Sequence, residues 1–384
     1  MAFGKAIYFL YYGGLACVIP FLTLYYSDLG LSGRQIGVLT GLVPLIGTLS
    51  SPIWGMAADA SGRHRITFLL ALGGTWTSVL LIMRAGSFLA LVPAVILYAV
   101  CSAPNMPLVD DAVVAFLGEE RRGEYGRVRV WGSYGWGLAA ALIGVAIAAS
   151  GLQAGFYGFL VIFLVLIPIA SRLPMNLSER SANFFGELRV LLKNSSWLLF
   201  IAVSMVIGAS IGIFLNYLFP YLESLGTSAQ TMGLTLTLAT ISEIPIFIFS
   251  RQLLNRWSAP FLLTLALVGT VLRSLAYGLM TAPWQVLPIS LLHGPTFALM
   301  WIAGVSYSAA VAPPGLGATA QAVFSGLTMG LGAALGSLAG GFIYEAYGPV
   351  SLYYSIALVT VVATVVFILA NRKSVAAGLV RQRS

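Results

Sequence analysis

Hydrophobic positions along this chain form long uninterrupted runs that are separated by short polar connections. Each run has about 20 residues, which is the length that an α-helix needs to cross the hydrocarbon core of a bilayer, and runs of this length are longer than ordinary strands. We count about twelve of them, at residues 5–27, 33–58, 66–86, 88–117, 126–149, 153–173, 197–224, 229–250, 260–280, 284–311, 317–344 and 349–371. The pattern predicts an all-α integral membrane protein and leaves little chain for a soluble domain.

Composition supports this interpretation. Of the 384 residues, 59% are hydrophobic and 8% are charged, and the mean hydropathy is +0.93, whereas a soluble domain carries about 25% charged residues. The first run is too long for the core of a signal peptide and is followed by further runs of the same kind, so we expect it to be a retained helix. No cleaved signal is predicted.

The positions of the basic residues predict the orientation. With an even number of spans both termini lie on one side of the membrane, and only Arg34 and Arg84 are expected on the other side. The side of the termini would hold Lys5, Arg63, Arg65, Arg121, Arg122, Arg127, Arg129, Arg172, Arg180, Arg189, Lys193, Arg251, Arg256, Arg372, Lys373, Arg381 and Arg383. Because loops rich in Lys and Arg remain on the cytoplasmic side of a membrane, we expect a multi-pass protein of the cell inner membrane with both termini in the cytoplasm. The net charge of +8 then needs no nucleic-acid partner.

Chemistry-bearing motifs of enzymes and metalloproteins are not evident. The two cysteines, Cys17 and Cys101, fall in different apolar runs and have no metal-ligand spacing, so they are interpreted as packing residues. No HExxH motif and no catalytic triad spacing is present, and the sequence predicts neither a metal site, nor a cofactor, nor an enzyme.

The chain looks duplicated. The segments "LGLSGRQIG" at 29–37 and "LGTSAQTMG" at 225–233 align without gaps, and each joins the first helix of a half to the second. The polar stretch between the sixth and seventh runs predicts a boundary, with an N-terminal six-helix bundle at 1–173, a cytoplasmic linker at 174–195 and a C-terminal six-helix bundle at 196–384. Duplicated halves are a recurring plan of transporters, in which a central site opens to alternate sides of the membrane.

A short motif between the second and third runs narrows the class. "GMAADASGRHR" at 55–65 resembles the signature loop of the major facilitator superfamily, and the resemblance rests on Gly55, Asp59, Gly62, Arg63 and Arg65. It implies the major facilitator fold, two pseudo-symmetric six-helix bundles, and a conformational gate whose ion pairs form in one arrangement and break in the other. The alternative is an exposed charged loop that only sets topology.

A second motif resembles the lactose permease and phenylpropionate permease families. In "EYGRVRVWGSYGW" at 124–136, Trp136 matches the position of a tryptophan that stacks on sugar in lactose permease, which implies a substrate-binding role. Asp110 and Arg129 each lie about 10 Å from a cytoplasmic helix end and could meet, and a guanidinium can hold a carboxylate with two hydrogen bonds. The alternative is a fixed interhelical pair. Which of Asp110 and Asp111 faces the cavity stays open.

Other polar residues could line the same cavity. Asn105 and Tyr12 are candidates for substrate binding, and each could equally be a polar contact that joins two helices.

Three ionisable residues lie inside consecutive runs of the second half: Glu243, Arg273 and His293. Placing a charged side chain inside the membrane costs free energy unless a partner compensates the charge. We therefore expect the three residues to pair with one another. They resemble the proton-coupling set of lactose permease, with one departure: a further carboxylate of that family is replaced here by Thr296. If coupling exists, Glu243 must carry the proton, with Arg273 modulating it and His293 relaying it or binding substrate. The alternative is a static cluster that holds the helices together.

These observations predict a secondary active transporter that takes up a small organic solute, such as an aromatic acid, a sugar or a nucleoside, together with protons. Its expected partners are the solute, protons and the lipid bilayer, and it is expected to work as a monomer. The main alternative is a proton-antiporting exporter of small molecules. A non-transporting receptor or an intramembrane hydrolase is less favoured, because neither a partner-binding appendage nor a nucleophile with a positioned base is visible.

Overall fold

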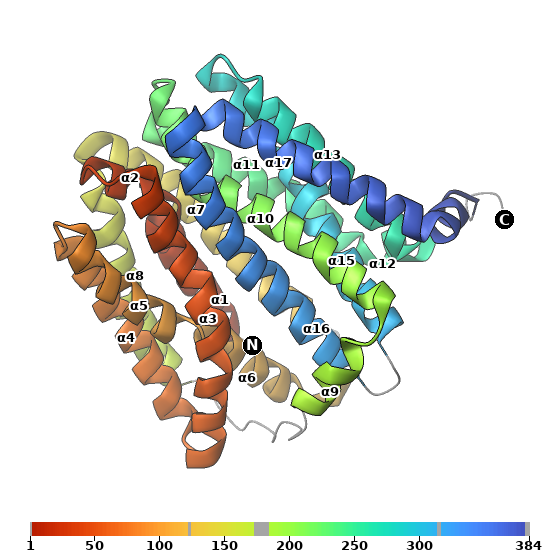
Figure 1. The fold of residues 1–384 in the computed structure, drawn as a ribbon. Coiled ribbons are helices and arrows are strands. Elements are labelled where there is room, and N and C mark those ends of the chain that lie inside the picture. The colour runs from red at the N-terminus through yellow and green to blue at the C-terminus, as the bar shows by residue number, and fades with distance from the viewer. Residues whose placement is uncertain (1, 122–123, 173–183, 313–315, 381–384) are drawn as a thin grey trace. The chain divides into compact units, whose positions relative to one another are not determined.

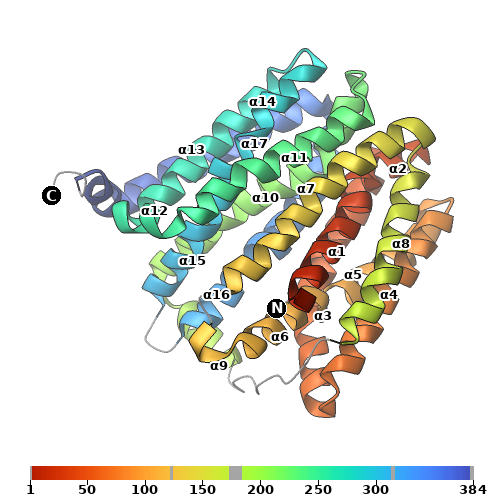
Figure 2. The ribbon, with the colours of Figure 1, turned by 180° about the vertical axis from the view of Figure 1, so that it is seen from behind.

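A computed structural model describes residues 2–121, 124–172, 184–312 and 316–380, and this part of the chain is almost entirely helical, with no strand in it. The helices up to residue 170 are α1 (Ala2–Val18), η1 (Ile19–Phe21), α2 (Leu22–Asp28), α3 (Gly33–Ser61), α4 (His64–Arg84), α5 (Phe88–Ser102), α6 (Asn105–Arg121), α7 (Tyr125–Ser150) and α8 (Gln153–Ala170). The others are α9 (Phe184–Leu191), α10 (Ser195–Ser224), α11 (Ala229–Ile248), α12 (Ser250–Arg256), α13 (Ala259–Gly278), η3 (Pro283–Gln285), α14 (Val286–Ser290), η4 (Gly294–Ala298), α15 (Leu299–Val311), α16 (Gly317–Ser325), η5 (Gly326–Gly332) and α17 (Ala333–Val380). Figures 1 and 2 show them from opposite sides.

Eleven helices in the described part of the chain are long and apolar enough to cross a membrane. The last of them, Thr319–Arg372, is 54 residues long and is broken at Gly348, whose backbone has a φ of 80° and is followed by Pro349. A positive φ is open to glycine and closed to most other residues, and proline cannot continue a helix, so the chain turns there. Counting this stretch as two spans gives twelve, and the prediction of an all-α membrane protein with about twelve spans is confirmed.

Contacts divide the chain into two units. The first comprises residues 1–180 and 227–237, and the second comprises residues 181–226 and 238–384. In the first unit α1 lies against α7 and α8, and α4 lies against α5; in the second, α10 lies against η5 and α17, and α13 lies against α15 and α17. The first helix of each half therefore packs on the fifth and sixth spans of the same half, as a duplicated sequence would produce.

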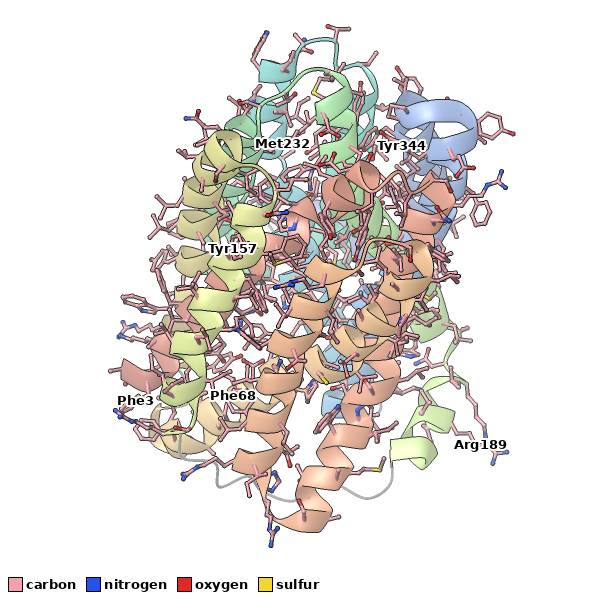
Figure 3. The ribbon with its side chains drawn as sticks, turned by 90° about the vertical axis from the view of Figure 1, so that its left-hand side faces the viewer. Phe3, Phe68, Tyr157, Arg189, Met232 and Tyr344 are labelled. Atoms are coloured by element: carbon pink, nitrogen blue, oxygen red, sulfur yellow. The ribbon has the colours of Figure 1, made fainter. Side chains whose placement is uncertain are left out.

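Large side chains of the first unit are sorted between its surface and its interior. Phe3 and Tyr157 are 45% and 55% exposed, whereas Phe68 is fully buried, and Figure 3 shows the three side chains. Exposed apolar side chains are expected on a surface that faces the hydrocarbon core of a bilayer, where no water is present.

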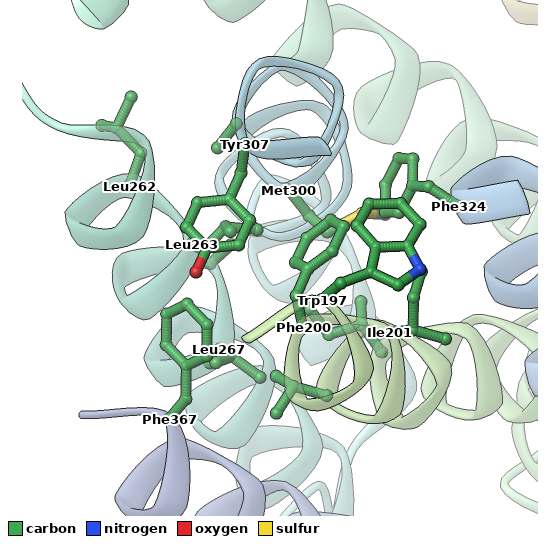
Figure 4. Close-up of a cluster of buried hydrophobic side chains, with 14 of the residues drawn as sticks. Trp197, Phe200, Ile201, Leu262, Leu263, Leu267, Met300, Tyr307, Phe324 and Phe367 are labelled. Carbon is green, nitrogen blue, oxygen red and sulfur yellow. The ribbon is translucent and has the colours of Figure 1, made fainter. Parts of the chain in front are cut away.

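The predicted linker at 174–195 is described only in part. Residues 173–183 lie outside the described residues, and the stretch that follows them forms α9. Leu191 of α9 is fully buried in the core of the second unit, while Arg189 is exposed. That core joins six helices, α9, α10, α13, α15, α16 and α17, and Figure 4 shows its members Trp197, Phe200, Ile201, Leu262, Leu263, Leu267, Met300, Tyr307, Phe324 and Phe367.

Glycines bring the helices of the second unit into close contact. A Cβ atom on Gly208 or Gly212 of α10 would collide with the backbone of Thr328 or Ala333, and one on Gly336 would collide with the backbone of Ala209. Small residues permit such approach between membrane helices. The four-residue spacing of glycines predicts this packing, but it does not predict that Gly326–Gly332 forms a π-helical segment.

Candidate functional site

Glu243 and His293 are in side-chain contact inside the second unit. Glu243 lies on α11, and His293 immediately precedes the π-helical segment η4. The distance between His293 Nε2 and Glu243 Oε1 is 2.8 Å, and the two side chains are 23% and 15% exposed, respectively. The structure thus brings together two of the three ionisable residues that the sequence singled out.

Arg273 on α13 completes the set and determines the protonation pattern of His293. Its Nη1 atom lies 2.8 Å from His293 Nδ1. A guanidinium can only donate hydrogen bonds, so Nδ1 must accept and cannot carry a hydrogen. The imidazole is therefore neutral with its hydrogen on Nε2, which it donates to the Glu243 carboxylate. The hydrogen bonds therefore run from Arg273 through His293 to Glu243.

The local backbone fixes this arrangement. The N–H of Gly294 donates to Ser242 Oγ at 2.8 Å, and a Cβ atom on Gly294 would collide with the Ser242 backbone. Only glycine lets η4 approach α11 so closely, and this contact lies beside both Glu243 and His293. Thr296, in the same π-helical turn, accepts from Arg273 Nη1 at 3.2 Å. π-Helical turns are rare and often occur at functional sites.

The other edge of the Arg273 guanidinium faces aromatic residues. Both Nε and Nη2 lie 3.3 Å from the Tyr277 hydroxyl, and the Cζ atom lies 4.5 Å from the centroid of the Phe214 ring. Arg273 is only 5% exposed, so these contacts and His293 replace the water that it loses. Sequence reasoning missed Tyr277, although its place four residues after Arg273 puts it on the same helix face.

The first unit holds a second polar cluster. The Tyr8 hydroxyl donates to Asp110 Oδ1, and Arg129 Nη2 donates to the Tyr12 hydroxyl at 2.6 Å. The Arg129 Cζ atom also lies 4.5 Å from the Tyr12 ring centroid and 5.2 Å from that of Tyr8. No direct ion pair joins Asp110 and Arg129 among the described contacts, so the expected meeting of the two charges takes place through tyrosines. Tyr125 also lies beside Asp110.

Glycine also shapes this cluster. A Cβ atom on Gly132 would lie 2.7 Å from Tyr12 Cδ2 and 2.8 Å from Arg129 Nη1, so the side chains fit only because that position has none. Trp136 follows Arg129 by seven residues, or two helical turns, which places the two residues on the same face of α7 about 10 Å apart along the axis. Trp136 is half-buried, and its role in binding stays a prediction.

Asn105 joins two helices. Its Nδ2 atom donates to Thr75 Oγ1 at 3.0 Å, and the residue is fully buried. Its Oδ1 atom has no hydrogen-bond partner among the described residues. The structure gives Asn105 a helix-joining contact, and a substrate contact through Oδ1 remains a prediction.

The signature loop connects α3 and α4. Gly62 ends α3 with a φ of 62°, a left-handed conformation that favours glycine. Asp59 Oδ1 lies 3.8 Å from Nε2 of His64, a residue that sequence reasoning missed even though it stands inside the motif. Arg63 and Arg65 are exposed. Gly55 lies within α3, and a Cβ atom there would meet no other atom within 4 Å, so no packing constraint explains this glycine.

Metal binding has no support in the described residues, which contain no group of three or more His, Cys, Asp or Glu side chains that could hold an ion. What the two clusters offer chemically is hydrogen bonding, charge and a carboxyl group that can take up a proton.

Twelve spans, two units and buried charge clusters define a membrane transporter of the major facilitator type. A model of the MFS_1 like family matches residues 4–355, and the chain belongs to this family. It is therefore a transporter and not an enzyme.

Individual relatives agree with this assignment. The maltose permease of Geobacillus stearothermophilus is 28% identical over 375 residues, covering 97% of this chain and 94% of that protein. The probable 3-phenylpropionic acid transporter of Escherichia coli K12 is 26% identical over 370 residues, covering 93% and 94%. A crystal structure of the nucleoside transporter NupG superimposes with a TM-score of 0.85 at 18% identity, covering 96% of this chain and 98% of that one, which shows a shared fold.

Proposed function

We propose that this protein is a proton-coupled symporter that takes up a small organic solute by alternating access. The observation that carries the proposal is the hydrogen-bonded series of Arg273, His293 and Glu243, of which Arg273 is buried and the other two are partly buried. The series holds a carboxyl group, a relay group and a cation in contact within one unit. A static packing role would not require a titratable histidine between the two charges, because an arginine and a carboxylate satisfy each other directly.

Protonation would change the balance of this cluster. With Glu243 ionised, the charges of the glutamate and of Arg273 compensate each other across a neutral histidine. A proton on Glu243 removes the negative charge and leaves the cluster cationic, so the two states favour different surroundings and different conformations. Glu243 is the proton carrier in this proposal, Arg273 modulates it, and His293 relays the proton.

The Arg129 cluster supports a substrate site in the first unit. A guanidinium has five N–H donors, and the described contacts of Arg129 use one of them, on Tyr12. The remaining donors suit a carboxylate or the hydroxyls of a sugar, and the face of Trp136 suits a ring. Aromatic acids, sugars and nucleosides fit these features, and the two relatives named for maltose and 3-phenylpropionic acid fall in the first two classes.

The setting of the protein is part of the proposal. The charge distribution supports an inner-membrane location with both termini in the cytoplasm. Two six-helix bundles joined by the segment at 174–195 would supply the alternating halves, with Gly55, Asp59, Gly62, Arg63 and Arg65 at the cytoplasmic gate. A single chain would suffice, with the solute, protons and lipid as its partners.

Proteoliposomes with an imposed pH gradient test the proposal. Purified protein is supplied with labelled maltose, 3-phenylpropionate or uridine, and we expect one of them to accumulate against its gradient when the outside is acidic, with protons entering alongside. Accumulation that requires the opposite gradient would show an exporter. Transport by the parent protein that ignores the pH gradient would remove proton coupling from the proposal.

Glu243→Gln tests the carrier residue. Glutamine resembles protonated glutamate in shape but cannot release a proton, so uphill accumulation should vanish while exchange of labelled for unlabelled solute persists. Asp28→Asn, at an exposed carboxylate on α2, is the matched control and should accumulate solute as the parent does. Loss of exchange in a folded Glu243→Gln variant would place Glu243 in substrate binding instead.

A further inference from the structure

Two buried tyrosine hydroxyls near Arg273 have hydrogen-bonding capacity that no described residue uses. Tyr353 on α17 is fully buried, and its hydroxyl has no hydrogen-bond partner among the described residues. Tyr277 on α13 is also fully buried; its hydroxyl accepts from Arg273, and within the described part of the chain nothing accepts its own hydrogen. A buried hydroxyl without a partner costs free energy, so such groups commonly bind water or take part in function.

These two hydroxyls belong to a series of tyrosines. The ring centroids of Tyr277 and Tyr353 are 5.3 Å apart, and those of Tyr353 and Tyr221 are 5.6 Å apart. Tyr344 follows Tyr221 at a longer distance, within electrostatic range of it and of the exposed carboxylate of Glu223. Tyr344 is half-buried, whereas the other three tyrosines are buried. The series therefore leads from the surface to the guanidinium of the proton site, entirely within the second unit.

The surface end of this series lies away from the cytoplasmic charges. Figure 3 shows Tyr344 of α17 and Arg189 of α9 toward opposite ends of the second unit. Arg189 is one of the cations that the sequence places in the cytoplasm, so the Tyr344 end is expected at the outer surface, where the protons for uptake arrive.

We propose that Tyr344, Tyr221, Tyr353 and Tyr277, here called the tyrosine path, carry protons between the outer surface and the Glu243–His293 pair with water molecules between their hydroxyls. The proposal rests on the proposed proton coupling and names its route. Each phenol accepts a proton on its oxygen and passes on the hydrogen that it already carries, so every tyrosine is neutral before and after the transfer. The hydrogen of Tyr221, which is donated to the Met280 carbonyl at 3.0 Å, must turn from that carbonyl to the next water during the transfer.

The last transfer explains the contact between Arg273 and His293. While Arg273 donates to Nδ1, that nitrogen cannot accept a proton, so Arg273 closes the inner end of the path. When the guanidinium moves away, Nδ1 binds the incoming proton and Nε2 gives its hydrogen to Glu243 Oε1. The histidine ends neutral with its hydrogen on Nδ1, Glu243 ends protonated, and one proton has been taken up.

The charged and titratable groups around Tyr353 come from three helices. They are Tyr221 on α10, Arg273 and Tyr277 on α13, and Tyr344 on α17. Arg273 is the cation among them and repels a proton arriving beside it, which restricts transfer to the state in which Arg273 has moved.

Tyr353→Phe is the sharpest test, because it removes one hydroxyl that has no described partner. The variant should melt at the parent temperature or above it, since a buried unsatisfied group is removed. Protonation of Glu243 is followed in proteoliposomes after an external pH jump by infrared spectroscopy, using the carboxyl band that Glu243→Gln abolishes. We expect the final amplitude of the band to match the parent and its rate to fall by about tenfold or more, as when a positioned proton donor is lost.

Further variants separate the path from a general effect on packing. Tyr277→Phe should lower the rate at which the carboxyl band appears in the same way. Tyr307→Phe removes a hydroxyl outside the path that donates to Asn371 Oδ1 at 3.2 Å, and it should leave the rate unchanged. Parent-like rates in both Tyr353→Phe and Tyr277→Phe would overturn the path and leave Glu243 as the carrier. A reduced final amplitude would overturn it too, by showing that the tyrosines hold the site together. A parent protein without a Glu243 band would instead overturn the proposed proton coupling.

Discussion

Arg273 and Arg129, the arginines of the two clusters, differ in how many of their N–H donors are used. Arg273 makes four hydrogen bonds to His293, Thr296 and Tyr277, and it is held from both edges. Arg129 makes one, to Tyr12, and rests on two aromatic rings. With four of its five N–H donors engaged by the protein, Arg273 has little capacity left for a solute, whereas Arg129 has spare donors for a ligand that arrives and leaves.

Arg129→Lys tests this difference. Lysine keeps the charge but loses the planar fork and the stacking on Tyr12, so affinity for the transported solute should fall by about tenfold or more. Arg127→Lys, at an exposed position of the same helix, should bind as the parent does. Affinity is measured by solute-dependent thermal shift on purified protein. Unchanged affinity in a folded Arg129→Lys variant would take Arg129 out of the substrate site.

Helices are the scale at which the sequence is most informative. Apolar runs of about 20 residues locate the spans, and the break at Gly348 and Pro349 falls between the last two expected runs. The grouping of Glu243, Arg273 and His293 follows from the cost of burying charge. The tyrosine contacts of Asp110 and Arg129, and the π-helical turn after His293, could not be predicted, because they depend on how neighbouring helices pack and not on the composition of any one of them.

Gly294 is the point at which helix packing controls the contact between Glu243 and His293. In Gly294→Ala the new Cβ would collide with the Ser242 backbone and push η4 away from α11. Overpacking of this kind costs about 1–3 kcal/mol, so the melting temperature should fall, and pH-driven uptake should fall with it because Glu243 and His293 separate.

Gly317→Ala provides the control for that change. A Cβ on Gly317 would meet no other atom within 4 Å, and alanine is a better helix former than glycine, so melting and uptake should be retained. Equal stability of the Gly294 and Gly317 variants would show that the close approach of η4 and α11 does not constrain the site.

At the scale of the whole molecule, duplication accounts for the two-unit architecture, and charge asymmetry bears on the membrane orientation. Duplication supplies two units in which the first helix packs on the fifth and sixth spans, one holding the Arg129 cluster and the other holding the Arg273 cluster. Charge asymmetry predicts which ends of these units meet the cytoplasm. The direction of the tyrosine path, from the outer surface inward, depends on that orientation, and so does the cytoplasmic position of the signature loop.

Orientation is tested with single cysteines on either side of α3. In a chain that carries Cys17→Ala and Cys101→Ala, Ser27→Cys and Ala60→Cys each place a thiol at an exposed position, before and after the same span. If the cations near Ala60 keep that end in the cytoplasm, as the positive-inside rule predicts, a membrane-impermeant maleimide added to right-side-out vesicles should label Ser27→Cys and spare Ala60→Cys. In inverted vesicles the pattern should reverse. Labelling of Ala60→Cys from outside in sealed right-side-out vesicles would place the termini on the outer face, and the tyrosine path would then open to the cytoplasm.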